Sequence, residues 1–261
     1  MMSESIRAVD RALDILLCFS HQTPQLTMTQ IAERVGMNKS TVHRLLGTLE
    51  RRRFVQRNPT TGAYQLGIRL LQMAYLTLSH NDIRRHAGPF MRRLCEQHRE
   101  TITLSTLDDT DVVFLDVIES PQRVKLAAST GQRMPAFSTA AGKAILAFLP
   151  DVTVERILDR GMPQFTPHTI CNKEELLHNL ASIREQGFSM SIQEYEDGIN
   201  AVAAPVLNEE SFPIAAVTVA GPGYRLTKEK MLEIGPSVRD TSRQIAQEVT
   251  LASEPDSITE A

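Results

Sequence analysis

Apolar residues recur at helical spacing in three stretches of the first fifty positions. The first stretch predicts a helix over residues 6–19, which a break around Pro24 ends. Its apolar positions are Val9, Leu13, Leu16 and Leu17. The second stretch begins with Thr27 and Gln30, a spacing typical of a capping box. Gly36 suits a left-handed helix end, so the second helix is predicted to be short.

The third stretch predicts a helix with two contrasting sides. Asn38 suits its N-cap, and the helical pattern follows over residues 39–54. The apolar side comprises Val42, Leu45, Leu46 and Leu49. The opposite side is polar or cationic around one glycine and comprises Ser40, His43, Arg44, Gly47 and Arg51. A helix that presents donors in this way suits the major groove of DNA, and the alternative is an ordinary solvent-exposed side.

A short hairpin is predicted directly after this helix. Residues 54–55 and 63–66 have the pattern of strands around a turn at 58–62, and Arg57 lies on the hairpin. With the two preceding helices, the hairpin predicts a winged helix-turn-helix over residues 1–66. The candidate DNA-contacting residues are Thr27, Thr29, Lys39, Ser40, Thr41, His43, Arg44 and Arg57.

Residues 67–81 predict a linker helix with one apolar side. That side comprises Ile68, Leu71, Tyr75 and Leu78. Because an apolar helix face is unfavourable in water, this helix is expected to pack on a partner. The partner is either the rest of its own chain or a second copy of the protein.

From residue 82 onward, helical spacing gives way to the alternation typical of strands. Strands are predicted at 101–107, 112–119, 124–128, 188–192, 200–207 and 214–220. Helices are predicted at 82–100, 138–149, 152–158, 173–186 and 227–251. This mixture predicts an α+β domain with an antiparallel sheet over residues 82–252, followed by a flexible tail at 253–261.

Charge is distributed unevenly between the two predicted parts. Residues 1–80 carry ten Lys and Arg against five Asp and Glu, a net charge of +5. The remaining residues carry 18 Lys and Arg against 26 Asp and Glu, a net charge of −8. Either the imbalance is ordinary scatter, or only the N-terminal part meets a polyanion such as DNA.

The composition is that of a soluble globular protein, with 42% hydrophobic and 23% charged residues. Cys18, Cys95 and Cys171 are too dispersed for a disulfide framework or a cysteine-rich zinc site. The sequence lacks an apolar run long enough to span a membrane, and its first residues lack the pattern of a signal peptide. We therefore expect a cytoplasmic protein without a metal, a cofactor or a membrane partner.

Familiar catalytic motifs are missing from the C-terminal part. The stretch AAGKA lacks the spacing of a phosphate-binding loop, and no nucleophile elbow or zinc-binding helix motif occurs. The carboxylates of residues 193–197 (QEYED) are expected to lie in a solvated loop, although acid–base groups are the alternative. No catalytic residue is therefore assigned.

A binding pocket has better support. Ser138 or Thr139 can cap the helix that starts at Ala140, where small side chains leave backbone N–H groups accessible to an anion. The alternative is tight helix–sheet packing by small residues.

Several of these stretches together resemble the IclR family of bacterial regulators. They are residues 31–46 (IAERVGMNKSTVHRLL), 64–67 (YQLG), 131–135 (GQRMP), 139–144 (TAAGKA) and 221–222 (GP). The resemblance spans about residues 6–252. It implies a winged helix-turn-helix that binds operator DNA, a linker helix that pairs across a dimer or tetramer, and a GAF-like or PAS-like domain that binds a small-molecule effector. Repression is the commoner mode in the family.

The same resemblance implies an effector site. The matching positions are Leu126, Met134, Ala140, Ala141, Ser191, Ile199, Ala201, Thr218 and Ala220. Ala201 and Ala220 stand where family members that sense small carboxylates carry Cys or Ser, and Thr218 is polar. A larger, partly apolar acid is therefore expected in place of a glyoxylate-like one.

Two other functions fit parts of the pattern. The C-terminal domain could be an enzyme that converts its ligand, which would require a polar cavity with acid–base groups. The helix-turn-helix could instead bind a protein, in which case its binding would lack the steep salt dependence of phosphate contacts.

Overall fold

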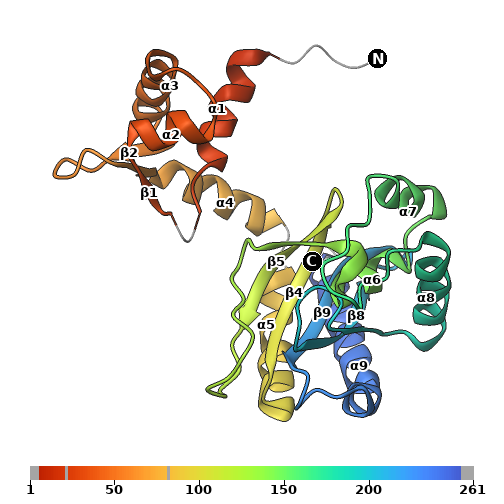
Figure 1. Ribbon diagram of the computed structural model, residues 1–261. Helices are drawn as coiled ribbons and strands as arrows, with labels where there is room; N and C mark the ends of the chain where they lie inside the picture. Colours follow the sequence, from red (N-terminus) through yellow and green to blue (C-terminus); the bar gives the residue numbers. More distant parts are fainter. Residues whose placement is uncertain (1–5, 21–22, 81–82, 254–261) are drawn as a thin grey trace, which may run out of the picture. The chain divides into compact units, whose positions relative to one another are not determined.

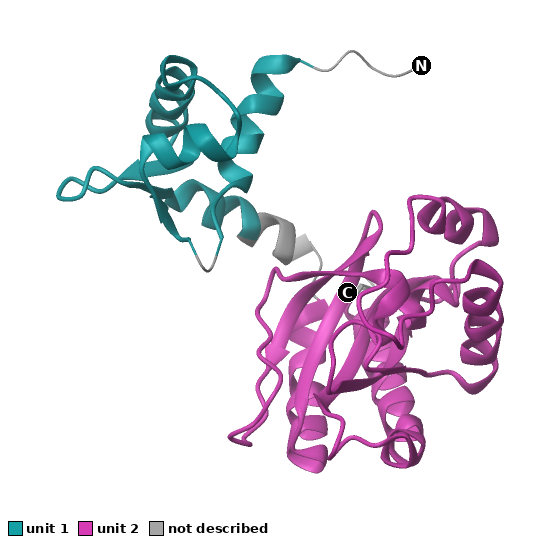
Figure 2. Cartoon of the chain, in the orientation of Figure 1, with its two compact units in different colours: residues 1–81 teal, residues 82–261 magenta. Residues whose placement is uncertain are grey.

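The computed structural model describes residues 6–20, 23–80 and 83–253, with the side chains of 75–80 excepted. The chain folds as two compact units, residues 1–81 and 82–261 (Figure 2). Each unit has its own hydrophobic core. Apart from Ser253, the predicted tail lies outside the described residues.

The N-terminal unit contains a helix-turn-helix, a small sheet and a long last helix (Figure 1). Its helices are α1 (Arg7–Leu17), α2 (Met28–Arg34), α3 (Lys39–Arg51) and α4 (Ile68–His80). Its strands are β1 (Gln25–Leu26), β2 (Val55–Arg57) and β3 (Tyr64–Leu66). They form an antiparallel sheet in the order β1-β3-β2. The predicted hairpin is thus present, and β1, which the sequence analysis did not predict, adds a third strand to it.

Local capping fixes the ends of the two central helices. The Thr27 hydroxyl accepts a hydrogen bond from the Gln30 backbone N–H, and the Gln30 side chain accepts one from the Thr27 N–H, so the predicted capping box is confirmed. Asn38 Oδ1 accepts from the Thr41 N–H at 2.9 Å, which confirms it as the N-cap of α3. Gly36 adopts the left-handed conformation expected between them, with φ +62°.

The first helix does not bury the side that its apolar spacing suggested. Ile15 is its fully buried residue, whereas Val9, Leu13 and Leu17 are 52%, 50% and 80% exposed. The apolar periodicity was correctly interpreted as helical, but much of the stripe faces away from the core of its own unit.

The C-terminal unit is built on a six-stranded antiparallel sheet in the order β6-β5-β4-β9-β8-β7. Its strands are β4 (Thr101–Asp108), β5 (Asp111–Ile118), β6 (Arg133–Pro135), β7 (Ser189–Ile192), β8 (Ile199–Leu207) and β9 (Pro213–Pro222). Its helices are α5 (Ile83–His98), η1 (Ala136–Ser138, a 3-10 turn), α6 (Ala140–Leu146), α7 (Asp151–Leu158), α8 (Lys173–Gln186) and α9 (Lys228–Ser253). The α+β prediction with an antiparallel sheet is confirmed.

Two elements of this unit differ from their prediction. Residues 124–128 form no strand, and the edge strand β6 lies further along the chain. The helix predicted at 138–149 is divided, because Thr139 is extended between η1 and α6 and caps α6 with its side chain.

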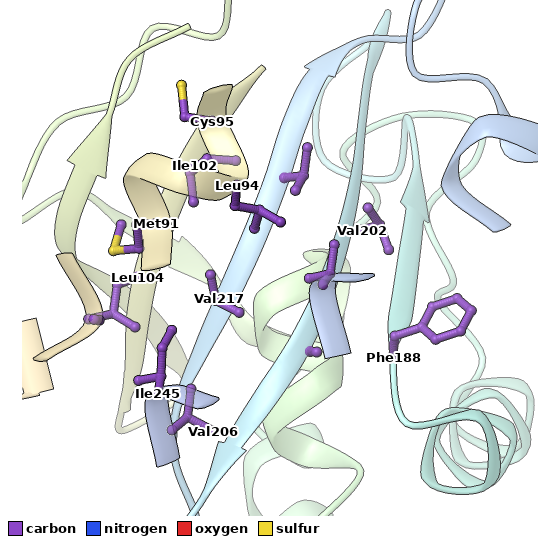
Figure 3. Close-up of a cluster of buried hydrophobic side chains, with 14 of the residues drawn as sticks. Met91, Leu94, Cys95, Ile102, Leu104, Phe188, Val202, Val206, Val217 and Ile245 are labelled. Carbon is purple, nitrogen blue, oxygen red and sulfur yellow. The ribbon is translucent and has the colours of Figure 1, made fainter. Parts of the chain in front are cut away.

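Successive side chains along each strand point to opposite faces of the sheet, and different helices cover the two faces. One face packs against α5 and α9 around a cluster that includes Leu94, Ile102, Val202 and Val217 (Figure 3). The opposite face packs against α6, and α7 and α8 contribute to the same apolar cluster as Val112, Ala203 and Ala216. The candidate ligand cavity lies on this second face.

Candidate DNA-binding surface and ligand cavity

The predicted two-sided character of α3 is present in the structure. Val42 and Leu46 are completely buried, and Leu49 is 9% exposed, so these residues fix the helix against α1 and α2. Most of the candidate side chains project outward: Lys39, Ser40, His43 and Arg44 are exposed and Thr41 is half-buried. The arrangement leaves cationic and hydrogen-bonding groups free to meet a duplex.

Three of the candidate residues, Thr27, Ser40 and Arg57, already take part in local hydrogen bonds. Thr27 closes the capping box of α2, and the half-buried Thr29 follows it in the first turn. The Ser40 hydroxyl donates to Asn38 Oδ1 at 3.0 Å. Arg57 Nε donates to the Gly62 carbonyl at 3.2 Å, and its guanidinium lies 5.7 Å from the Tyr64 ring centroid. The Arg57 side chain therefore braces the hairpin while remaining exposed.

A cavity lies between the N-terminal end of α6 and the face of the sheet. All nine candidate effector residues lie on its wall, brought together from six separate stretches of the chain. The wall contains seven further residues that the sequence analysis did not assign to the site: Thr103, Val112, Phe114, Ser138, Thr139, Tyr195 and Glu196. The alternation of the strands is the signal that could have identified the first three.

Strand register explains why these residues meet. Ser191 pairs with Ala201, and Ala201 pairs with Ala220, across β7, β8 and β9. Thr218, two residues before Ala220, pairs with Thr103 on β4. Side chains that are paired or two residues apart share a face of a sheet, so this row points toward α6.

The first turn of α6 packs closely against η1 because Gly142 has no side chain. A Cβ atom at this position would lie 2.0 Å from the carbonyl oxygen of Ala136 and 2.3 Å from its Cα. The Thr139 hydroxyl accepts from the Gly142 N–H at 3.2 Å, which leaves the N–H groups of Ala140 and Ala141 without a partner inside the helix.

The cavity is mostly apolar with a few polar groups. Within the described part of the chain, the buried hydroxyl oxygens of Ser138 and Thr218 have no hydrogen-bond partner. None of the described residues on the wall is Lys or Arg, and Glu196 is its one carboxylate. The cavity has a volume of about 60 Å³. This is several times the roughly 10–15 Å³ that a single bound water needs, so a small organic molecule can enter it.

The loop after β7 matches its prediction as a solvated segment at Glu196 and Asp197, which are exposed, but not at Glu194. Glu194 is only 6% exposed, and its Oε1 accepts a hydrogen bond from Lys143 Nζ at 2.5 Å. Burial lowers the pKa of Lys143 and raises the pKa of Glu194, and the attraction between the two charges opposes both shifts. Sequence analysis missed this pair because its members are 51 residues apart.

The described residues contain neither a metal-binding group of side chains nor a membrane-spanning helix. Across residues 6–20, 23–80 and 83–253, no three His, Cys, Asp or Glu side chains are grouped so as to hold a metal ion. The helices that the structure describes are each too short or too polar to cross a membrane.

Comparison with known families matches both units. A family model described as the IclR helix-turn-helix domain matches residues 8–59. A second, described as the bacterial transcriptional regulator IclR C-terminal domain, matches residues 75–247.

Individual relatives extend over most of the chain. The HTH-type transcriptional regulator XynR of Escherichia coli K12 is 35% identical over 216 residues, which are 82% of this chain and 86% of XynR. KipR of Bacillus subtilis 168, also named an HTH-type transcriptional regulator, is 30% identical over 249 residues, or 95% of this chain and 99% of KipR. The HTH-type transcriptional repressor AllR of E. coli K12 is 29% identical over 250 residues, or 95% of this chain and 92% of AllR.

Solved structures share the fold. The IclR transcriptional regulator of Alicyclobacillus acidocaldarius is 30% identical, with a TM-score of 0.82 over 94% of this chain and 99% of that one. An IclR homologue of Microbacterium hydrocarbonoxydans, solved with 4-hydroxybenzoate, is 24% identical, with a TM-score of 0.82 over 93% and 98% of the two chains. The winged helix-turn-helix, the antiparallel α+β domain and these matches agree, and the chain belongs to the IclR family of bacterial transcriptional regulators.

Proposed function

We propose that this regulator binds operator DNA through α3 and the β2–β3 hairpin, and that a small carboxylic acid in the cavity beside α6 controls its affinity. The observation that carries the DNA-binding part is the exposed polar side of α3, opposite the buried Val42 and Leu46. Lys39, Ser40 and Thr41 form the first turn, which in helix-turn-helix proteins lies nearest the base edges. The repressor AllR, 29% identical, supports repression as the mode of control.

A single arginine tests this surface. On a duplex selected from a random pool by the wild-type chain, Arg44→Ala is expected to weaken binding by about ten- to a hundredfold, because one base or phosphate contact is worth about 1–3 kcal/mol. Arg156→Ala removes the same charge from an exposed site on α7 and is expected to leave binding unchanged. Fluorescence anisotropy at fixed salt measures both, and equal affinities for the two variants would remove α3 from the interface.

We also propose that the protein binds DNA as a homodimer, or as a tetramer built from such dimers. On α4, Ile68 and Leu71 are 55% and 64% exposed although they lie on one side of the helix. Their predicted companions Tyr75 and Leu78 have side chains outside the described residues. An apolar helix side of this kind favours a partner, and a second copy would present two identical DNA-binding units to the two halves of a symmetric operator.

The chemistry of the cavity supports an acid with an apolar body. The unpartnered hydroxyls of Ser138 and Thr218 and the N–H groups of Ala140 and Ala141 are donors that a carboxylate can use without an arginine. Phe114, Leu126 and Met134 supply apolar walls for the remainder of the ligand. A buried polar group without a partner costs stability, which a ligand oxygen would recover.

Matched acids and amides test the ligand class. Benzoate and 4-hydroxybenzoate are expected to raise the melting temperature of the C-terminal unit, while benzamide and 4-hydroxybenzamide are not. At a hundred times the dissociation constant the gain is about 2.7 kcal/mol, or roughly 5–10 °C for a unit of this size. Thr218→Val is expected to reduce the shift, and Thr106→Val, on the same sheet outside the cavity wall, to preserve it. An equal shift with acids and amides would contradict the carboxylate assignment.

A further inference from the structure

The buried pair Lys143–Glu194 joins the two walls of the ligand cavity. Lys143 lies in α6, three residues after Ala140, and Glu194 lies in the loop between β7 and β8. Their side chains are 1% and 7% exposed. Neither residue lines the cavity, but residues within one helical turn or two positions of them do: Ala140 and Ala141 on one wall, Tyr195 and Glu196 on the other.

Apart from this ion pair, the contacts that hold the loop of residues 193–198 come mainly from the segment between α7 and α8. The Thr169 hydroxyl donates to the Glu194 carbonyl at 2.6 Å, and the Thr166 hydroxyl donates to the Gln193 carbonyl at 2.6 Å. The Tyr195 ring lies 5.0 Å from the ring of Phe165, which is itself 40% exposed. Both threonines and Phe165 belong to the irregular segment between α7 and α8. Among the described residues, the Lys143–Glu194 pair is therefore the hydrogen-bonded connection from this loop to α6, which carries the opposite wall.

Burying an ion pair has a large free-energy cost. Removing both charges from water opposes the attraction between them, and the direction of both pKa shifts shows that burial dominates here. Glu194 Oε2 is in addition buried without a partner among the described residues. Two apolar side chains of similar volume would fill the same space at lower cost, so what the pair adds is a fixed, directional connection.

We propose that Lys143 and Glu194 are positioning residues for the ligand cavity: their ion pair latches residues 193–198 to α6 and holds Tyr195 and Glu196 as its outer wall. The latch sets how often this wall opens, and thereby how tightly a ligand is retained. The role of the ion pair in holding the loop does not depend on the proposed function. Only its effect on ligand retention assumes that the cavity is the effector site.

Hydrogen exchange of the loop amides in the full-length, ligand-free protein tests the latch. The N–H of Gln193 donates to the Ile199 carbonyl at 3.0 Å, and the N–H of Gly198 donates to Gln193 Oε1 at 2.8 Å. Both bonds close the loop on itself, so their exchange reports how often the loop loses its own fold once it is released from α6. The single variant Lys143→Met leaves a buried carboxylate, whereas the double variant Lys143→Met/Glu194→Met removes both charges and retains apolar volume. Exchange at these amides is expected to become about ten- to a hundredfold faster in the double variant, as for loss of a charged hydrogen bond.

The controls separate positioning from general destabilisation. Amides of β4 are expected to keep their wild-type rates in the double variant, and Lys230→Met, which breaks an exposed pair with Glu233 on α9, is expected to change nothing in the loop. Wild-type exchange at Gln193 and Gly198 in the double variant, or equal acceleration across β4, would overturn the latch. Failure of the wild-type protein to bind any of the acids would instead count against the effector site, because the exchange measurement uses no ligand.

Discussion

Leu71→Glu is expected to convert the protein to a monomer and to weaken operator binding by about two to four orders of magnitude. Leu71 lies 64% exposed on the apolar side of α4. Burying a leucine stabilises an interface by about 1.5–3 kcal/mol, and a carboxylate in the same place adds a desolvation cost. A symmetric dimer contains residue 71 twice, so the substitution incurs both losses in each subunit. In a dimer, binding of one half-site holds the second DNA-binding unit close to the other half-site. A monomer loses this advantage, so its affinity for the whole operator is lower.

Sedimentation velocity and anisotropy on the same samples measure the two effects together. Met73→Glu is the matched control: two residues further along α4, it adds the same charge on the opposite side of the helix. It is expected to leave the protein dimeric and operator binding near the wild-type level. A Leu71→Glu protein that remains dimeric and binds normally would show that another surface forms the dimer.

Gly142→Ala is expected to lower the stability of the C-terminal unit by about 3 kcal/mol, or roughly 6–12 °C in melting temperature. The new Cβ would lie 2.0 Å from the Ala136 carbonyl oxygen, and both contacting segments are backbone, so α6 or η1 must move. The shift would displace Ala140 and Ala141 and so change the cavity as well. Response to the ligand is therefore expected to be lost at temperatures where the variant is still folded.

Gly88→Ala provides the comparison in the same unit. Gly88 lies inside α5, and the nearest group to its added Cβ is the flexible Arg92 guanidinium at 3.4 Å. Alanine is the better helix former by about 1 kcal/mol, but a Cβ is disfavoured in the helical conformation directly before Pro89, so this variant is expected to melt near the wild-type temperature. Scanning calorimetry resolves the two outcomes. Equal melting of both variants would show that the contact at Gly142 relaxes without cost.

The features that the sequence predicted well are those determined by neighbours in the chain. The capping box of Thr27 and Gln30 and the N-cap Asn38 depend on residues three positions apart, and both were predicted correctly. The buried side of α3 follows from helical periodicity alone. The strands of the main sheet follow from alternation, although residues 124–128 show that a short apolar run can remain unpaired and largely exposed.

What the sequence could not give depends on contacts between distant segments. The strand β1 has two residues and exists only because it pairs with β3, about 40 positions later. Glu194 belongs to a polar run that is typical of a surface loop, and only the fold brings Lys143 to it. The exposed apolar residues of α1 were placed on a helix correctly, but periodicity does not state whether the covering surface belongs to the same chain.

The central claim is that this protein recognises a particular DNA sequence through α3. The most direct measurement is anisotropy of the wild-type chain on a selected duplex and on a scrambled duplex of the same composition, over a series of salt concentrations. The account predicts at least about a thousandfold preference for the selected duplex, with affinity falling steeply as salt rises. Equal affinity for the two duplexes, or binding that salt does not weaken, would contradict it.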